Sequence, residues 1–329
     1  MSTYAVYSIP LRLIGEMSQL PDSQKVFGAL CHAYADCVSA EEVSEFVSGV
    51  KNRSIAFSLS NVMPKGLLPV PRSFILRKHA GGEKELYQEL KKRDFASKET
   101  IISLVKNPKE LMKTGNRMKK ARYASVKLSQ QVHTNTEPSK SEPFSVLRSV
   151  CRIYQNEKEP TIACDFEFYL RCDVENAHCK KIIAILKAGF LFTFGRRSSQ
   201  GYNLFEVTER PKLISDGLFS DGDCTVYLNL GMLLPDDINY SFPSRSGVKS
   251  SLDLFTSERR PYAPSSWNEG GHQGWFISFV APGSIVVVSP NTPMAEITRC
   301  TFCKTADGAD DVNRIVFGNA LLLPFEGGV

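Results

Sequence analysis

The order of apolar and polar residues predicts that the first part of the chain alternates strands with helices. Residues 4–13 are rich in β-branched and aromatic side chains and predict a first strand. A helix is expected to begin at Ser23, because apolar side chains then recur every three or four residues. A shorter helix is expected to begin at Ser39, with a glutamate three residues later that completes a capping box. Lys25 and His32 fall on the polar side of the first helix.

The same alternation returns further along the chain. A strand is expected over 54–60, and prolines then impose an extended, irregular path. Two alternating runs, 145–154 and 161–170, predict a β-hairpin. A helix over 176–188 and a strand over 202–207 follow. The order β, α, β, insertion, β, α, β is typical of a ferredoxin-like domain.

The insertion, at about 74–141, differs in character from the rest of this domain. Its leucines are patterned but sparse, and its polar end at 130–138 predicts a loop. The segment from Arg72 to Lys127 has sixteen Lys or Arg against six Asp or Glu, which is +10, so the rest of the +5 chain carries −5. A basic, thumb-like arm of this kind indicates a polyanionic partner. The alternative is a flexible, charged segment in solvent that binds no partner. We expect the arm to be mobile when the protein is alone.

The remainder of the chain predicts a second, strand-rich domain with little helix. Its strands are expected over 224–230, 252–255, 274–280, 283–288 and 315–324. The fold class is therefore α+β with antiparallel sheets. We divide the chain into an N-terminal domain over 1–212, which carries the insertion, and a C-terminal domain over 213–329.

The loop after the helix at 176–188 has the composition of a phosphate-binding loop. It reads Gly195, Arg196, Arg197, Ser198, Ser199, Gln200, Gly201, Tyr202. Glycine permits positive φ and a close approach of main-chain N–H groups to an anion. Arginine forks and serine hydroxyls add donors that match phosphate oxygens, and the tyrosine could stack on a base. The alternative is an ordinary connection with arginines in solvent.

Composition excludes several classes of protein. No apolar run reaches the roughly 18 residues that span a bilayer, and the first residues lack the basic start of a secretory signal. We therefore expect a cytoplasmic protein that does not associate with a membrane. Nine cysteines lie without a framework spacing, and the close pair Cys300 and Cys303 has no second pair to complete a zinc site. We expect reduced thiols, no metal and no cofactor.

Catalytic alternatives depend on the histidines. A serine nucleophile at 198 or 199 would need a histidine base, and neither His133 nor His178 has a context that favours this. A metal-free endoribonuclease would need only a side-chain acid and base near the loop, with His133 the first candidate and His32 the second. No glycine pattern of the nucleotide-binding kind precedes a helix. We therefore expect a non-catalytic protein and keep the endoribonuclease as an alternative.

Four segments in one order resemble a known superfamily. They are the helix at 26–34, the run from 57 to 71, the loop at 195–202 and the ending at 317–324. Together they resemble the repeat-associated mysterious protein (RAMP) superfamily of CRISPR systems. Within it they are most similar to the fourth Csm subunit of type III-A complexes, a member of the Cas five group.

This resemblance implies two ferredoxin-like (RRM-like) domains and a part in antiviral defence. It implies a subunit that grips the 5′ repeat-derived tag of the guide RNA, contacts the large polymerase-like subunit and the backbone RAMP subunit, and meets target RNA only indirectly. The implied RNA-binding residues are Gly195, Arg196, Arg197, Ser198, Ser199, Gly201, Tyr202, Lys25, His133, Asn135, Lys119, Lys120 and Arg122. A protein-only adaptor, whose basic insertion meets an acidic protein, is the further alternative.

Overall fold

The structure of the chain is a computed structural model. It describes residues 4–79, 84–108, 123–134, 145–155, 161–195, 201–215, 219, 224–236, 247–259, 275–289, 292, 297–304 and 310–325. Among the helices within these ranges, none combines the length and the apolar character needed to cross a membrane.

The largest sheet is antiparallel and is built around the first strand. Its path runs β10 (Leu191–Thr193), β11 (Leu204–Val207), β1 (Tyr4–Ile14), β9 (Asp165–Asp173), β2 (Phe57–Leu59). Two short strands join it at the sides, β12 (Lys212–Leu213) on β1 and β3 (Met63–Pro64) on β9. The sheet therefore unites segments from both ends of the predicted N-terminal domain.

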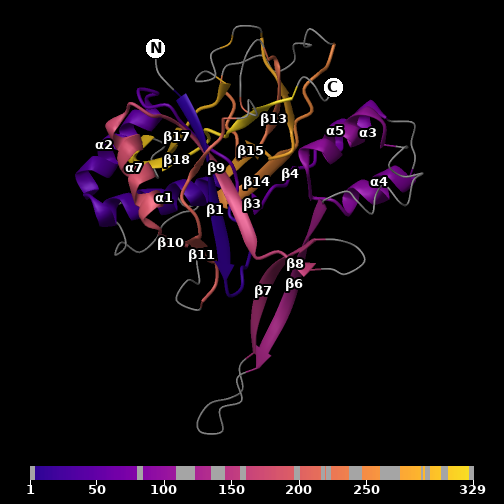
Figure 1. Cartoon of the computed structure of the whole chain (residues 1–329), viewed down its shortest axis with the longest axis horizontal. Coiled ribbons are helices and arrows are strands. Elements are labelled where there is room, and N and C mark those ends of the chain that lie inside the picture. Colours follow the sequence, from indigo (N-terminus) through magenta and orange to yellow (C-terminus); the bar gives the residue numbers. More distant parts are fainter. Residues whose placement is uncertain are drawn as a thin grey trace.

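Three helices lie together on one side of this sheet (Figure 1). They are α1 (Ser23–Cys37), α2 (Ala40–Lys51) and α7 (Ala177–Ala188). Each begins at a residue that caps it, since Asp22, Ser39 and Asn176 accept hydrogen bonds from main-chain N–H groups of the first turn. α7 ends at Gly189, whose φ is +83°, as expected for a glycine that terminates a helix.

An aromatic cluster joins these helices to the end of the chain. The ring of Phe27 in α1 stacks on Phe317 at a centroid distance of 4.3 Å and an interplanar angle of 11°. Phe46 of α2 and Phe57 of β2 complete the cluster with a T-shaped contact at 5.1 Å. The C-terminal segment thus contributes to the same hydrophobic core as the first helix.

A second antiparallel sheet includes β5 and β6 of the predicted insertion. Its order is β4 (Leu68–Pro69), β5 (Phe95–Ala96), β6 (Tyr123–Thr134), β7 (Ser145–Gln155), β8 (Thr161–Ile162). Three helices belong to this region, α3 (Arg72–Lys78), α4 (Lys84–Lys91) and α5 (Lys98–Lys106). Their leucines are few but buried, and Leu86, Leu90 and Leu104 belong to the main core. The ribbon of β6 and β7 extends away from the body (Figure 1).

The predicted hairpin of 145–154 with 161–170 is confirmed only beside its turn, where β7 pairs with β8 at Tyr154 opposite Ile162. The long partner of β7 is β6, from Ala124 opposite Gln155 to Thr134 opposite Ser145. β9 pairs along β1, and only the two residues of β8 meet β7. Alternation identified the strands correctly, but it carries no information on which strand is the partner.

The loop predicted at 130–138 is also wrong in its first part, because β6 continues to Thr134. The described side chains of β6 from Lys127 to Gln130 are exposed, including Leu128 at 71%. A ribbon that stands in solvent needs no apolar face, so the hydrophobic signal for a strand is absent there.

The described residues after β12 form three small antiparallel sheets. They are β16 (Ile285–Val287), β13 (Val226–Asn229) and β19 (Leu322–Pro324); β14 (Leu254–Arg259) with β15 (Trp275–Val280); and β17 (Thr301–Lys304) with β18 (Asp310–Val316). The α+β fold class with antiparallel sheets is confirmed. The boundary at 212 stays a prediction.

Candidate nucleic-acid interface

The glycine and arginine loop leaves the main sheet between β10 and β11. Both glycines that bound it have positive φ, +89° at Gly195 and +77° at Gly201, the conformation for which glycine was expected. A Cβ atom on Gly195 would lie 3.8 Å from Cε of Lys25. The loop therefore begins beside the cationic side chain of α1. Arg196, Arg197, Ser198 and Ser199 lie outside the described residues.

Lys25 occupies the first turn of α1. Its N–H donates to the Asp22 carboxylate at 3.0 Å, and the N–H of Ser23 donates to Oδ1 of Asn61 at 2.8 Å. These side chains already satisfy two of the amides that a helix N-terminus would offer to an anion. The contribution of α1 to phosphate binding would then come mainly from the ammonium group of Lys25.

Tyr202 does not provide the stacking surface that the sequence suggested. Its side chain is only 4% exposed and belongs to the hydrophobic interior. Its backbone forms a parallel bridge to Glu16, directly after β1. Tyr202 thus anchors the end of the loop, and a base would have to stack elsewhere.

The segment Gly15–Ser18, which we call the junction segment, connects this loop to the β6–β7 ribbon. The N–H of Cys151 in β7 donates to the carbonyl of Met17 at 2.7 Å. Arg152, also in β7, forms an ion pair with Glu16 at 3.1 Å.

The base of the ribbon combines cations with an aromatic ring. Lys127 and Arg152 lie opposite each other on β6 and β7. Nζ of Lys127 lies 4.9 Å from the ring centroid of Tyr154. Hydrogen bonds to Glu16 and Tyr154 raise the pKa of Arg152. Sequence reasoning did not select these three residues, because finding them requires the pairing of β6 with β7.

The other predicted RNA-binding residues are less well defined by the structure. His133 lies near the end of β6, opposite Val146. Asn135, Lys119, Lys120 and Arg122 lie outside the described residues. His32 lies seven residues after Lys25 and therefore on the same side of α1. Desolvation lowers the pKa of His32, and the carboxylate of Asp36 opposes this shift.

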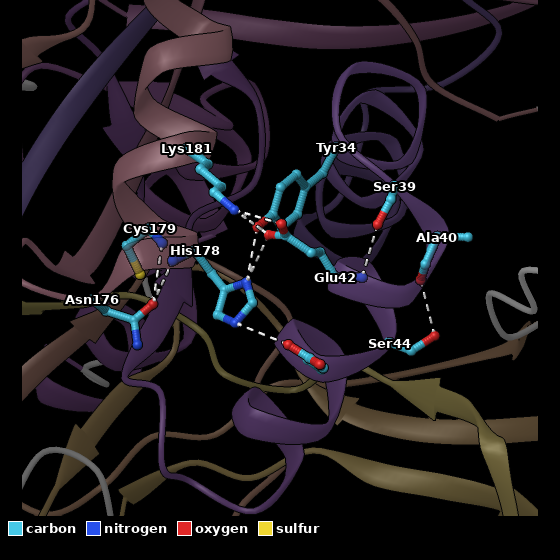
Figure 2. A network of polar contacts seen from close by, with 10 residues as sticks. Tyr34, Ser39, Ala40, Glu42, Ser44, Asn176, His178, Cys179 and Lys181 are labelled. Carbon is cyan, nitrogen blue, oxygen red and sulfur yellow. Dashed lines mark hydrogen bonds and ion pairs between the residues drawn. The ribbon is translucent and has the colours of Figure 1, made fainter.

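A polar network that sequence reasoning missed lies between α1, α2 and α7 (Figure 2). The hydroxyl of Tyr34 lies 2.8 Å from Oε2 of Glu42 and 2.8 Å from Nδ1 of His178. Nζ of Lys181 donates to Oε1 of Glu42 at 2.6 Å. Since the four side chains come from three helices, the network ties these helices together.

Proton positions in this network follow from the number of donors. Tyr34 has one proton, and when the hydroxyl donates to Glu42, Nδ1–H of His178 donates to the phenol oxygen. Burial and the hydrogen bond to Glu42 raise the pKa of Tyr34, so the phenol keeps its proton. Hydrogen bonds from Lys181 and Tyr34 lower the pKa of Glu42. The network therefore pairs a protonated Tyr34 phenol with an ionised Glu42 carboxylate, which is a structural contact between helices.

The fold and this interface define an α+β protein with antiparallel sheets and a basic, glycine-bounded loop beside an extended ribbon. No protein-family model and no curated protein matches the chain. Within the described residues, no group of three or more His, Cys, Asp or Glu side chains is placed to hold a metal ion.

Comparison with solved structures identifies proteins of similar fold. The chain is similar to a chain of the Csm1–Csm4 cassette in complex with cA4, with a TM-score of 0.51, 14% identity and 97% of each chain covered. It is also similar to a chain of the Csm3–Csm4 subcomplex of the type III-A CRISPR–Cas interference complex, with a TM-score of 0.50, 16% identity and coverage of 97% of this chain and 99% of that one. Csm4 is the component common to both. At the level of the fold, the resemblance to the Csm4 type of RAMP protein is confirmed.

Proposed function

We propose that the protein is a non-catalytic, RNA-binding subunit of a type III CRISPR ribonucleoprotein in the cytoplasm. It grips the 5′ repeat-derived tag of the guide RNA with the loop at 195–201 and the adjoining ribbon. It also joins the large polymerase-like subunit to the backbone RAMP subunit.

The similarity in fold over 97% of this chain carries the proposal. Partial matches to a common α/β unit would be compatible with many functions, but a match of both complete chains includes the ribbon and the C-terminal sheets. The partners proposed here correspond to those in the two similar structures, which contain Csm1 and Csm3 respectively.

The local geometry supports single-stranded RNA as the ligand. Two glycines with positive φ frame a sequence of two arginines and two serines, and Lys25 lies beside the first glycine. Lys127 and Arg152 add cations at the base of the ribbon, and Tyr154 adds a ring. Such sites combine backbone neutralisation with an aromatic surface.

Purification of the protein tests the proposal against the protein-only adaptor. Co-purified nucleic acid should give a high 260/280 absorbance ratio that falls after treatment with RNase. A ratio typical of pure protein, together with no binding of a labelled repeat RNA, would contradict RNA binding and favour the adaptor.

The same labelled RNA tests the endoribonuclease alternative. Pure protein without added metal should bind the RNA and leave it intact. Cleavage that is lost in a His133→Ala or a His32→Ala variant would favour the nuclease, because these are the candidate acid and base.

A further inference from the structure

One buried residue joins the loop to the junction segment. Asn203 is 1% exposed and has a φ of +59°. Arg53 is the other non-glycine residue with positive φ in the described part of the chain. Asparagine tolerates this left-handed conformation better than most residues, because its short polar side chain can form local hydrogen bonds.

Asn203 makes hydrogen bonds in two directions. Its main-chain carbonyl accepts from the N–H of Phe194 at 3.0 Å, which closes the base of the loop. Its N–H donates to the carbonyl of Glu16 at 2.8 Å, and its Oδ1 accepts from the N–H of Ser18 at 2.8 Å. Asn203 thus holds the junction segment by both its backbone and its side chain.

The junction segment in turn holds the ribbon. Between the two residues that Asn203 contacts lies Met17, whose carbonyl accepts from Cys151 of β7. On the loop side the packing is close, since a Cβ atom on Gly15 would lie 2.9 Å from the carbonyl oxygen of Gly201. Glycine is needed at position 15 for this contact and for its φ of +81°. A displacement of the junction segment would therefore change its contacts with both β7 and Gly201.

We propose that Asn203 is a positioning residue for RNA binding. It fixes the ends of the loop at Gly195 and Gly201 relative to β7, so that Lys25 beside Gly195 and the ribbon cations Lys127 and Arg152 bind one RNA strand as a single surface. The inference deepens the proposed function and rests on it. A fixed spacing between the loop and the cations of the ribbon lowers the ordering cost that binding must offset. Asn203 does not itself need to touch RNA.

Asn203→Gly separates the positioning contact from backbone strain. Glycine accepts the positive φ, so the variant loses the side-chain acceptor of the Ser18 N–H and the two hydrogen bonds between the Asn203 amide and the Ser18 hydroxyl, at 3.3 and 3.1 Å. Asn203→Asp keeps the acceptor of the Ser18 N–H and serves as the rescue variant. Ser18→Ala keeps the N–H and removes only the hydroxyl, so it removes part of the same contact.

Hydrogen exchange without RNA measures the coupling directly. In Asn203→Gly, the amides of Ser18 and Cys151 should exchange about tenfold faster, while Leu170 in the middle of β9 should not change. Asn203→Asp should exchange like the wild type at Cys151, and Ser18→Ala should give an increase smaller than that of Asn203→Gly. Faster exchange at Ser18 with unchanged exchange at Cys151 in Asn203→Gly would overturn the inference.

RNA binding supplies the second readout. Asn203→Gly should weaken binding of repeat RNA and reduce the slope of log K against log salt by about 0.7 for each phosphate contact that is lost. Unchanged affinity and slope would overturn the positioning role.

If the wild type itself fails to bind RNA, the proposed function is wrong. The exchange data then show separately whether loop and ribbon are coupled. Should Asn203→Gly unfold, Ser18→Ala is measured in the same way, because it removes the hydroxyl that contacts the Asn203 amide; faster exchange is expected at Cys151, and unchanged exchange would overturn the inference.

Discussion

At the scale of single residues, the proposed phosphate binding depends on charge and on backbone geometry. The charge comes from Arg196 and Arg197 and from Lys25 beside Gly195. The geometry comes from the positive φ of Gly195 and Gly201. These two contributions can be removed separately.

Removal of charge is tested by the double variant Arg196→Ala and Arg197→Ala. If each arginine neutralises one phosphate, the salt dependence of single-strand RNA binding should flatten by roughly 1.4 units of slope, at about 0.7 per contact. The melting temperature should barely move, because surface charges contribute little to stability. Unchanged affinity and slope, measured by fluorescence anisotropy over a salt series, would remove the loop from the RNA site.

Removal of backbone freedom is tested by valine at Gly195 and Gly201, with both arginines intact. A β-branched residue at positive φ costs about 1–2 kcal/mol or changes the backbone, so RNA affinity should fall. Gly28→Ala is the control, since Gly28 lies in α1 and a Cβ atom there meets nothing within 4 Å. Wild-type affinity in the valine variant would mean that the arginines act from an ordinary loop.

At the scale of elements, the helix layer is held by charge as well as by apolar packing. Lys181 of α7 and Tyr34 of α1 both contact Glu42 of α2 (Figure 2). The pKa of Glu42 is lowered by these hydrogen bonds, that of Lys181 first. Its contribution is therefore present above the unfolded carboxyl pKa of about 4.3 and is lost as the pH falls through the lower folded value.

Glu42→Gln should lower the urea midpoint of unfolding at pH 7, and the difference from the wild type should shrink at pH 3. Glu41→Gln is the matched control, because Glu41 lies in the same first turn of α2 and is exposed. An equal loss in both variants, or a difference that does not depend on pH, would contradict the role of the network.

The packing of α4 changes the expectation for the insertion. Leu86 and Leu90 are 3% and 1% exposed, so the trypsin sites at Lys91 and Lys92 lie at the end of a packed helix. Cleavage there should be slow in the free protein and faster in Leu90→Ala, which loosens the helix. Fast cleavage of the wild type would show that this part of the insertion is mobile, as its sequence suggested.

At the scale of the whole molecule, the spacing of apolar residues predicted the helices and strands better than it predicted which strands pair. The strands of the main sheet and the helices beside it were predicted from the spacing of apolar residues and from capping residues such as Ser39 and Asn176. The pairing of β7 with β6 did not follow, because the alternation within one strand does not identify its partner strand. Pairing brings Lys127, Arg152 and Tyr154 together, and contacts between distant segments place Asn203 against Ser18. The sequence therefore predicted the loop, while the interface around it needed the tertiary structure.

The whole molecule also supports the proposal that one RNA strand contacts both the loop and the ribbon. The junction segment contacts the loop base and β7 at once, so loop and ribbon share a single support. UV cross-linking of repeat-derived RNA to the purified protein, followed by mass-spectrometric mapping, tests this account most directly. We predict cross-linked peptides from residues 190–203 and from β6 and β7. Cross-links confined to other elements, such as β14 and β15, or the absence of any cross-link, would contradict the account.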